Sequence, residues 1–262
     1  MLALERRNII IERLNTDGKV VVATLSQEFG VTEETIRRDI EKLSNEGLAV
    51  KTYGGAVSNA MQTNAELPYN IRKKSNIDLK QKIAETVASM IKDGDRIMLD
   101  ASSTAIYVAR QIKSKKNITV ITNSVEILFE LADKTGWTIL STGGSLREGA
   151  FSLFGSAAEK MIRDHYVDYA ICSAKGIDSR MGISDSNEKD AEMKKAIFNA
   201  ASTRILALDS TKFDKISFIK VCDLKEIDVI VTDKDPGETW KKRFNENGVT
   251  LKAYGDNNYL DS

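Results

Sequence analysis

Short apolar runs alternate with amphipathic helical stretches from residue 78 to the end of the chain, and this alternation limits the possible folds more than any other feature. Strands and helices that follow one another in this way form a mostly parallel sheet with helices packed on its faces. The sequence therefore predicts a Rossmann-like α/β domain. Its expected first helix spans residues 78 to 91, and its expected strands are 96–100, 118–122, 137–140, 169–174, 204–209, 228–233 and 249–254.

The chain before residue 58 has a different period, which is helical in short pieces. After a first helix and an extended segment at 20–22, a second helix is expected to end at Gly30, since glycine commonly terminates helices. A third is expected to start with Thr32 as its N-cap and to run to about Asn45, with Gly47 closing it. The next residues, LAVKTYGGAV, predict a β-hairpin, so the whole unit is typical of a winged helix-turn-helix. The first helix is indicated by the spacing of Leu4, Arg7, Ile11 and Leu14.

These two patterns predict two domains. The winged helix-turn-helix is expected over residues 1–57 and the α/β domain over 77–262. Residues 58–76 have no clear period and contain Pro68, so we expect them to be a linker.

Composition narrows the class of protein only slightly. Lys and Arg number 38 and Asp and Glu also 38, so net charge does not point to nucleic acid. The two cysteines, Cys172 and Cys222, lie in apolar runs and predict buried thiols, with no metal site and no disulfide. The first residues, MLALERRNII, are charged early and lack a long apolar core, so we expect a cytoplasmic protein without a membrane segment.

The third helix of the first domain has a distinct inner and outer face. Ile36, Ile40 and Leu43 fall on one side and are expected to pack inward. Arg38 falls on the opposite side, where arginine can make a bidentate contact to guanine in the major groove. The residues that we expect to face DNA, either at bases or at phosphates, are Thr32, Glu34, Thr35, Arg37, Arg38, Lys51 and Tyr53.

Two adjacent arginines on an exposed helix are also compatible with simple solvation. Residues 1–57 carry eight basic and nine acidic side chains, which departs from the usual basic footprint of a DNA-binding domain. Binding through this helix would therefore depend on local charge placement, on dimerisation, or on both.

Polar turns follow several of the predicted strands in the second domain. In open α/β sheets, ligands bind beyond the carboxyl ends of the strands, so these turns are expected to line one crevice. Hydroxyls, backbone N–H groups and a lysine suit a phosphate, and a carboxylate suits a sugar hydroxyl. A single such turn is also explained by helix capping alone. The expected ligand-binding residues are Asp100, Ser102, Ser103, Thr104, Thr122, Asn123, Ser124, Gly143, Gly144, Lys175, Asp178 and Lys212.

The run VTEETIRRDIEKLSNEGLAVKTYGGAV closely resembles the signature of the DeoR family of bacterial regulators, roughly V-S-x-x-T-I-R-R-D-L, then L-x-x-x-G, then H-G-G-A. It departs from that signature at Thr32, where the family has serine, and at Tyr53, where it has histidine. The second domain also resembles the family, through K-x-x-I-A at 80–84, V-x-T-N-S at 120–124 and D-x-x-K at 209–212. The turn after the first strand reads D-A-S-S-T, whereas family members commonly have D-S-G-T-T.

This resemblance implies a function as well as a fold. It implies a DNA-binding transcriptional regulator, a repressor of a carbohydrate-utilisation operon, whose grip on double-stranded operator DNA changes when a phosphorylated sugar binds the second domain. That domain is similar in the family to ribose-5-phosphate isomerase and glucosamine-6-phosphate deaminase. Two-fold symmetric DNA sites make a homodimer or tetramer the expected assembly. No cofactor is expected.

Two other functions remain open at this point. An isomerase or deaminase would need an acid and a base beside the substrate, and Asp100, Asp178, Asp190 and Glu192 could supply carboxylates. The single histidine, His165, precedes the fourth strand of the sheet and is expected at the opposite end from the crevice. Alternatively, the second domain only dimerises, but such a domain would not require polar turns at its strand ends.

Overall fold

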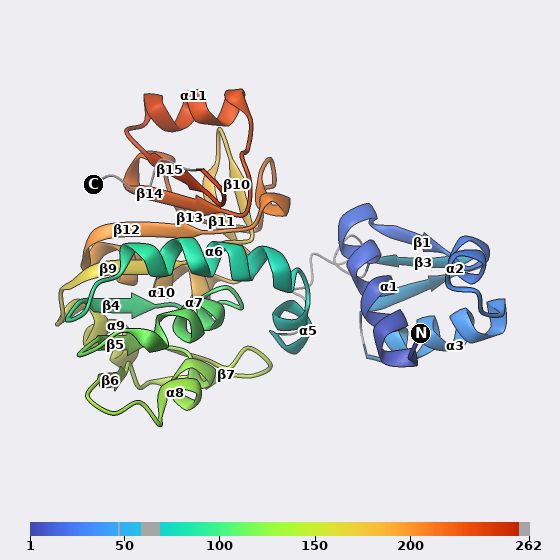
Figure 1. The fold of residues 1–262 in the computed structure, drawn as a ribbon, viewed down its shortest axis with the longest axis horizontal. Helices are drawn as coiled ribbons and strands as arrows, with labels where there is room; N and C mark the ends of the chain where they lie inside the picture. The colour runs from blue at the N-terminus through green and yellow to red at the C-terminus, as the bar shows by residue number, and fades with distance from the viewer. Residues whose placement is uncertain (47, 59–68, 257–262) are drawn as a thin grey trace. The chain divides into compact units, whose positions relative to one another are not determined.

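The computed structural model describes residues 1–46, 48–58 and 69–256, and the chain divides into two compact units, Met1–Asn76 and Ile77–Ser262 (Figure 1). Gly47 and residues 59–68, which include much of the expected linker, lie outside the described residues. A short helix, α5 (Tyr69–Lys74), occupies the end of the segment expected to be a linker.

The first unit is a helical bundle with a small sheet, as the sequence predicts. Its elements are α1 (Ala3–Asp17), β1 (Lys19–Val21), α2 (Val22–Phe29), α3 (Glu33–Asn45), β2 (Ala49–Thr52) and β3 (Gly55–Ser58). Gly30 ends α2 in the left-handed conformation, at φ +64°, which glycine adopts without the steric cost of a Cβ. The side chain of Thr32 caps α3 by accepting a hydrogen bond from the backbone N–H of Thr35. Both predicted helix boundaries are confirmed.

The core of this unit forms where the three helices meet the sheet. Ile36, Ile40 and Leu43 of α3 are buried in it, which confirms the predicted inner face of that helix. In α1 the buried residues include Ile10 and Leu14, and Leu4 is exposed instead of contributing to the core. Leu4 therefore lies on the outer side of α1, away from the core of the unit.

The hairpin pairs with the extended segment before α2 to make a three-stranded antiparallel sheet in the order β1-β3-β2. Thr52 pairs with Gly55, so Tyr53 and Gly54 form the two-residue turn at the tip of the wing. A Cβ on Gly55 would overlap the carbonyl oxygen of Val20, whereas one on Gly54 would meet nothing. Of the two adjacent glycines, Gly55 is therefore the one that strand packing requires.

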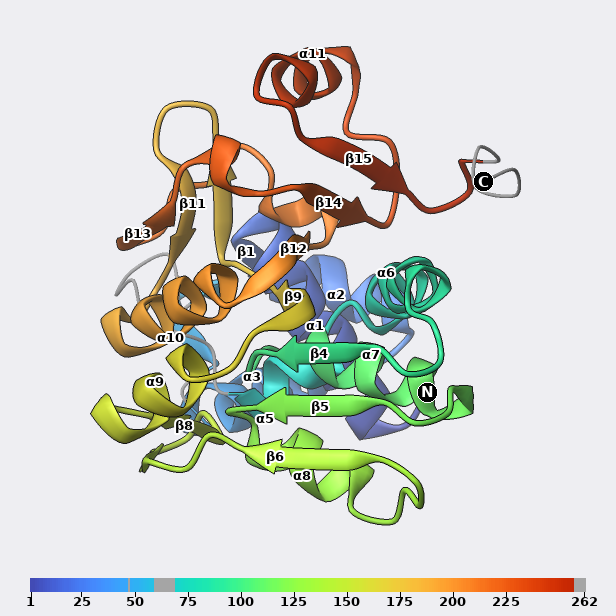
Figure 2. The same ribbon diagram turned by 90° about the vertical axis from the view of Figure 1, so that its left-hand side faces the viewer.

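The second unit is built on a seven-stranded sheet in the order β15-β14-β12-β9-β4-β5-β6, in which every neighbouring pair is parallel. Figure 2 shows β4, β5 and β6 side by side with their arrows pointing the same way. All the predicted strands are confirmed to within a few residues, and so is the α/β class. The strands are β4 (Arg96–Leu99), β5 (Thr119–Thr122), β6 (Thr138–Ser141), β9 (Val167–Cys172), β12 (Ala201–Ala207), β14 (Val229–Thr232) and β15 (Thr250–Ala253).

Helices cover both faces of this sheet and make two separate cores. Ile97 and Leu99 of β4 pack with α6, α7 and α8, while Met98 between them packs on the opposite face with α9 and α10. Strands that are buried on both faces are nearly continuous in apolar residues, which is why they were recognisable in the sequence. The helices are α6 (Ile77–Met90), α7 (Ala105–Gln111), α8 (Val125–Leu131), α9 (Ser156–Arg163), α10 (Glu188–Asn199) and α11 (Glu238–Glu246).

Two small antiparallel sheets were not predicted. One is the hairpin of β7 (Ser145–Arg147) and β8 (Ser152–Phe154), and the other has the order β10-β11-β13, from Gly176–Asp178, Gly182–Asp185 and Ile219–Cys222. Their strands have three or four residues each and lack a regular alternation of apolar and polar residues. Such short strands give almost no periodic signal.

The topology of the large sheet locates its ligand-binding edge. From β4 the chain proceeds outward to β5 and β6, and from β9 it proceeds in the other direction to β12, β14 and β15. The order therefore reverses between the neighbouring strands β4 and β9. A crevice outside the carboxyl ends of the strands forms at such a switch point, and it is where open α/β sheets bind ligands.

Candidate functional site

The outward face of α3 presents the basic residues of the predicted DNA-binding surface. The side chain of Arg38 is 77% exposed and that of Arg37 is 49% exposed, on the side of the helix away from Ile36 and Ile40. Thr35 lies nearer the core and is half-buried. The exposure of these side chains agrees with the helical wheel drawn from the sequence.

Each of the predicted DNA-binding cations is paired with a glutamate of α3. Arg37 Nη2 lies 3.0 Å from Glu33 Oε2, and Arg38 Nε lies 3.2 Å from Glu34 Oε1. Lys51 Nζ, from strand β2 of the wing, lies 2.9 Å from Glu41 Oε1. The hydrogen bond from Lys51 lowers the pKa of Glu41, so this carboxylate is charged at neutral pH.

The remaining predicted DNA-facing residues lie at the two ends of this surface. Thr32 and Thr35 share a hydrogen bond between their hydroxyls, 2.9 Å long, at the start of α3. Tyr53 is fully exposed at the tip of the wing. A phenol held out into solvent by a tight turn has no role in the core of the unit.

In the second unit, the carboxylate of Asp100 ties the ends of β4 and β9 together at the switch point. Its Oδ1 accepts the backbone N–H of Ser102 and its Oδ2 accepts that of Ser173, both at 3.1 Å. Its Oδ2 also accepts a hydrogen bond from Lys194 of α10. Asp100 is 1% exposed, so its carboxylate is surrounded by protein groups and not by water.

Lys194 and Asp185 are the members of this cluster that sequence reasoning missed. Lys194 Nζ lies 3.5 Å from Asp185 Oδ2, and both side chains are buried. Burial lowers the pKa of Lys194, but Asp100 and Asp185 raise it by more, and the net shift is well upward. The amine is therefore a protonated ammonium at any ordinary pH. Only the packing of α10 against the end of β4 brings Lys194 to Asp100, since the two residues lie 94 positions apart in sequence.

Several predicted ligand-binding hydroxyls serve the backbone. Thr122 Oγ1 donates to the carbonyl of Leu99 at 2.7 Å and accepts the N–H of Ser124 at 3.1 Å. Ser124 caps α8, and Ser102 accepts the N–H of Ala105 at the start of α7. These residues shape the strand ends, and the capping alternative accounts for the observed bonds of Ser102 and Ser124.

Asn123 has a different environment from its two neighbours. The side-chain Nδ2 of Asn123 donates to the carbonyl of Leu153 in β8 at 3.0 Å. In return, the backbone N–H of Leu153 donates to the backbone carbonyl of Asn123 at 2.7 Å. Its Oδ1 is buried and accepts no hydrogen bond from any described residue. A buried amide oxygen without a donor is costly, which makes it available to a donor from outside the protein.

The ends of β12 and β14 are also joined by hydrogen bonds. Ser210 donates to Asp233 from both its backbone N–H, at 2.6 Å, and its hydroxyl, at 3.1 Å. Lys212 follows in the same turn, is half-buried, and makes no ion pair with the described residues. Burial, and then the charge of Lys212, lower the pKa of the neighbouring Lys215. Lys212 and Lys215 are thus two neighbouring cations at this corner of the sheet, beside the carboxylates of Asp209 and Asp233.

The other predicted positions have mixed surroundings. A Cβ on Gly144 would lie 2.5 Å from the carbonyl oxygen of Phe154, while one on Gly143 would meet nothing. Asp178 accepts the N–H groups of Arg180 and Met181 within the β10–β11 hairpin, and these bonds lower its pKa. The remaining positions lie in the same strand-end turns, with Ser103 and Thr104 buried and Lys175 half-buried.

Comparison with protein-family models decides the family. Residues 6–62 match a DeoR-like helix-turn-helix domain, and residues 75–234 match the DeoR C-terminal sensor domain. The chain belongs to the DeoR family. It is a DNA-binding transcriptional regulator, and the two matched segments correspond to the two units of the structure to within two residues at their boundary.

Individual relatives span nearly the whole chain. The HTH-type transcriptional regulator YulB of Bacillus subtilis strain 168 is 40% identical over 97% of this chain and 97% of its own length. The putative aga operon transcriptional repressor of Escherichia coli O157:H7 is 32% identical over 88% and 86%. The L-fucose operon activator of Haemophilus influenzae is 32% identical over 93% and 97%. Among solved structures, ribose 5-phosphate isomerase A of Methanocaldococcus jannaschii is 19% identical, with a TM-score of 0.39 over 53% of this chain and 55% of that one.

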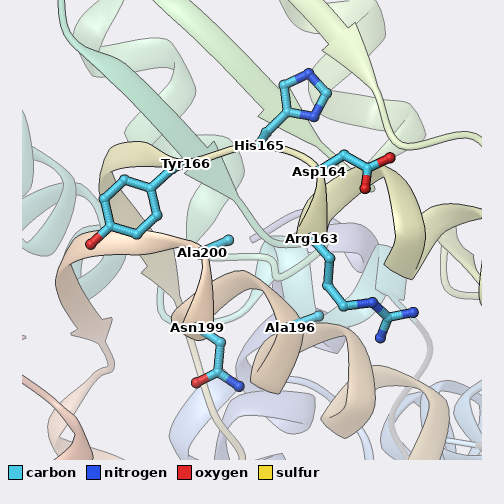
Figure 3. A pocket seen from close by; sticks show the side chains of 7 residues that line it. All are labelled: Arg163, Asp164, His165, Tyr166, Ala196, Asn199 and Ala200. Atoms are coloured by element: carbon cyan, nitrogen blue, oxygen red, sulfur yellow. The ribbon is translucent and has the colours of Figure 1, made fainter.

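The histidine of this DeoR-family chain lies away from the strand-end cluster, as the sequence predicts. His165 precedes β9 and borders a hollow of about 240 Å³ with Tyr166 and Asn199, at the edge where β9 and β12 begin (Figure 3). His165 Nδ1 lies 2.7 Å from the carbonyl oxygen of Met161, and the ring is exposed. Figure 3 shows His165 and Asn199 on separate elements with their side chains pointing apart.

Two further expectations concern the cysteines and the membrane. Cys172 and Cys222 are buried free thiols, so the predicted burial of both cysteines is confirmed. Burial raises the pKa of Cys222 to about 12. Among the described residues, no helix combines the length and the apolar character needed to cross a bilayer.

Proposed function

We propose that this chain is a repressor of a carbohydrate-utilisation operon that binds double-stranded operator DNA through α3 and the wing and responds to a phosphorylated sugar bound at the carboxyl edge of the large sheet. Among its relatives are a putative aga operon transcriptional repressor and an L-fucose operon activator. The observation that carries the effector site is the set of buried polar strand ends at the β4/β9 switch point, flanked by the half-buried cation Lys212.

On the DNA side, Arg38 is the residue that reads a base, because it extends furthest from the packed face of α3. Arg37, Thr35 and Thr32 contact phosphates and fix the register of the helix along the groove. Lys51 and Tyr53 contact the backbone next to the groove from the wing. The ion pairs on this face are exposed, so they contribute little to stability and yield readily to a phosphate.

On the effector side, the ligand has one anionic and one hydroxyl-bearing end. Lys212 binds the phosphate, with the hydroxyls of Ser103 and Thr104 as further donors. Asn123 Oδ1 accepts a hydrogen bond from a sugar hydroxyl, which removes an unsatisfied buried acceptor. Thr122, Ser124 and the two glycines at 143–144 hold the surrounding turns in place.

We do not favour catalytic turnover at this site. A general base needs a pKa near neutrality, and the ammonium of Lys194 is held protonated by two carboxylates. Asp100 accepts hydrogen bonds from two backbone N–H groups and from Lys194 and is 1% exposed, so its carboxylate holds the strand ends together. His165, the only histidine of the chain, borders the opposite edge of the sheet.

The working assembly is a cytoplasmic homodimer or tetramer, because operators with two-fold symmetry are bound by proteins of matching symmetry. The sugar phosphate releases DNA by binding one arrangement of the subunits more tightly than another. Only that difference in affinity can shift the balance between the DNA-bound and free forms.

Calorimetric titration of the full chain with a panel of sugar phosphates, followed by gel-shift titration on DNA with the best ligand, tests this proposal. We expect one phosphorylated sugar to bind and to weaken the DNA complex, and the unphosphorylated sugar to bind far more weakly. Absence of binding across the panel would rule out the effector site. Consumption of the ligand would favour an enzyme, and tighter DNA binding would favour an activator.

A further inference from the structure

The predicted DNA-binding surface carries as many carboxylates in ion pairs as it carries cations. Glu33, Glu34 and Glu41 each hold one cation, at 3.0, 3.2 and 2.9 Å respectively. All six side chains of these pairs are about half exposed or more, so they lie on the open side of the unit and not in its core. We refer to Glu33, Glu34 and Glu41 as the glutamate set.

Helix stability explains only part of this arrangement. Glu33 and Glu34 lie in the first turn of α3, where a negative charge interacts favourably with the helix dipole. Glu41 lies in the body of the helix, beyond the reach of that effect. Exposed pairs at this spacing add little to the stability of a helix. The stability of the folded unit therefore does not explain why each cation of this surface, including Lys51 of the wing, is paired with a carboxylate.

The glutamate set has a direct consequence for binding to DNA. A phosphate that binds Arg37 or Lys51 must displace a carboxylate, which then faces a polyanion at short range. This repulsion is the same for every DNA sequence, because all sequences carry the same phosphates. Contacts to base edges add favourable free energy only at the correct sequence. A uniform repulsion therefore weakens every complex by the same factor. Non-specific complexes become sparse at a protein concentration at which the operator complex, which also has base contacts, is still populated.

We infer that Glu33, Glu34 and Glu41 limit the affinity of the recognition face for DNA of any sequence, so that only a complex with base contacts is well populated. This inference rests on the proposed DNA-binding role of α3 and the wing. It also explains why residues 1–57, although they are proposed to bind DNA, carry nine acidic side chains against eight basic ones. In such a unit, non-specific complexes are kept sparse because the general affinity for DNA is low.

The test compares the wild-type chain with the full-length triple variant Glu33→Gln, Glu34→Gln, Glu41→Gln on a random-sequence 24-base-pair duplex, by fluorescence anisotropy over a range of KCl concentrations. Glutamine keeps the size of the side chain and removes its charge. We expect binding to the random duplex to tighten by about two- to threefold per glutamate and roughly tenfold in total, with a steeper dependence on salt. Binding to a duplex selected from a random pool by the wild-type chain is expected to tighten by a similar factor, because the repulsion is the same for every sequence. More random DNA is then bound at a protein concentration that saturates the selected duplex.

A matched control removes three carboxylates from exposed pairs elsewhere. Glu159→Gln, Glu192→Gln and Glu238→Gln break pairs with Arg163, Lys195 and Lys241 in the second unit, at 3.2, 2.8 and 3.1 Å. If this control tightens non-specific binding as much as the triple variant does, net charge is responsible and the inference fails. It also fails if the triple variant, folded by circular dichroism, binds the random duplex no more tightly than wild type. Failure of the wild-type chain to select any duplex would instead contradict the proposed DNA-binding face itself.

The single variant Glu34→Gln tests whether Glu34 contacts a base instead of repelling DNA of any sequence. A glutamate in the major groove can accept a hydrogen bond from cytosine. In that case Glu34→Gln alone would lower affinity for the selected duplex and leave the random duplex unaffected, which would remove Glu34 from the glutamate set. Tighter binding to the random duplex with Glu34→Gln supports its inclusion.

Discussion

Arg6 of α1 and Asp39 of α3 form an ion pair between their side chains, which are 8% and 7% exposed. Asp39 directly follows Arg38 in the chain but points to the opposite side of the helix, into the unit. The pair therefore joins the helix that is proposed to read DNA to the first helix of the bundle. In the T-I-R-R-D segment, the aspartate positions the helix and the two arginines face outward.

Asp39→Ala is expected to destabilise the first unit by about 3–5 kcal/mol, because it leaves the guanidinium of Arg6 buried without a partner. Hydrogen exchange of the α3 amides in the full chain measures this loss locally, and exchange in β9 is expected to be unchanged. Glu28→Ala is the matched control, since it breaks the exposed pair with Arg13. Equal exchange in the two variants would mean that the buried pair has no special importance.

Gly55→Ala is expected to disrupt the wing, whereas Gly54→Ala is expected to be tolerated. The added Cβ at position 55 overlaps the carbonyl oxygen of Val20, and forcing atoms into packed space costs about 1–3 kcal/mol or more. The Cβ at position 54 meets nothing within 4 Å. Thermal unfolding of the two variants, followed by circular dichroism, compares them directly. Similar melting of both would show that β1 does not pack closely on β3.

Arg38→Ala and Lys51→Ala are expected to affect DNA binding in different ways. Loss of Arg38 removes a base contact, so affinity for the selected duplex falls by about 1–3 kcal/mol and preference at one position relaxes. Loss of Lys51 weakens all complexes alike and reduces the slope of log affinity against log salt by about one. Binding to a set of single-base variants at several salt concentrations measures both. Unchanged binding by Arg38→Ala would mean that α3 is turned differently in the groove.

Lys212→Ala is expected to remove the response to the effector without changing DNA binding. A charge-assisted contact to phosphate contributes about 1.5–3 kcal/mol, so ligand affinity is expected to fall roughly 10- to 100-fold. Lys160→Ala on the exposed surface of α9 is the control. Asp100→Ala is a poorer test, because it leaves Lys194 buried with one carboxylate partner and so destabilises the domain. A full response by Lys212→Ala would place the phosphate elsewhere.

Low pH is expected to lower the free energy of unfolding of the second unit, because two Arg–Asp ion pairs at the amino edge of its sheet are lost. Arg204 holds Asp228 at 2.8 and 2.9 Å, and Arg96 holds Asp168 in the same way. The bonds from Arg204 and Arg96 lower the pKa of the two aspartates. Their contribution is therefore complete above the unfolded pKa of about 3.9 and is lost as pH falls through the lowered folded pKa. Denaturant titrations between pH 6 and pH 2 are expected to show a shallower acid loss for Asp228→Asn. An unchanged profile would mean that the Arg204–Asp228 pair does not contribute to the loss of stability in acid.

The sequence was sufficient to predict the elements that depend on local pattern. The central strands of the large sheet, such as β4 and β14, are buried on both faces, and the apolar runs of the strands gave boundaries within a few residues. Capping chemistry placed the ends of α2 and α3 at Gly30 and Thr32. The spacing of Ile36, Ile40 and Leu43 was enough to orient α3, because a helix fixes the direction of every side chain once one face is buried.

Tertiary structure alone decided which distant groups meet. Lys194 lies 94 residues from Asp100 and Arg6 lies 33 residues from Asp39, and no local period marks such pairs. Topology also placed the switch point between β4 and β9, since strand order follows from packing and not from the strands themselves. The sequence by itself thus determined the helices, the strands and their exposed faces through short-range periodicity, while long-range contacts determined which polar groups are buried together and which remain open to a ligand.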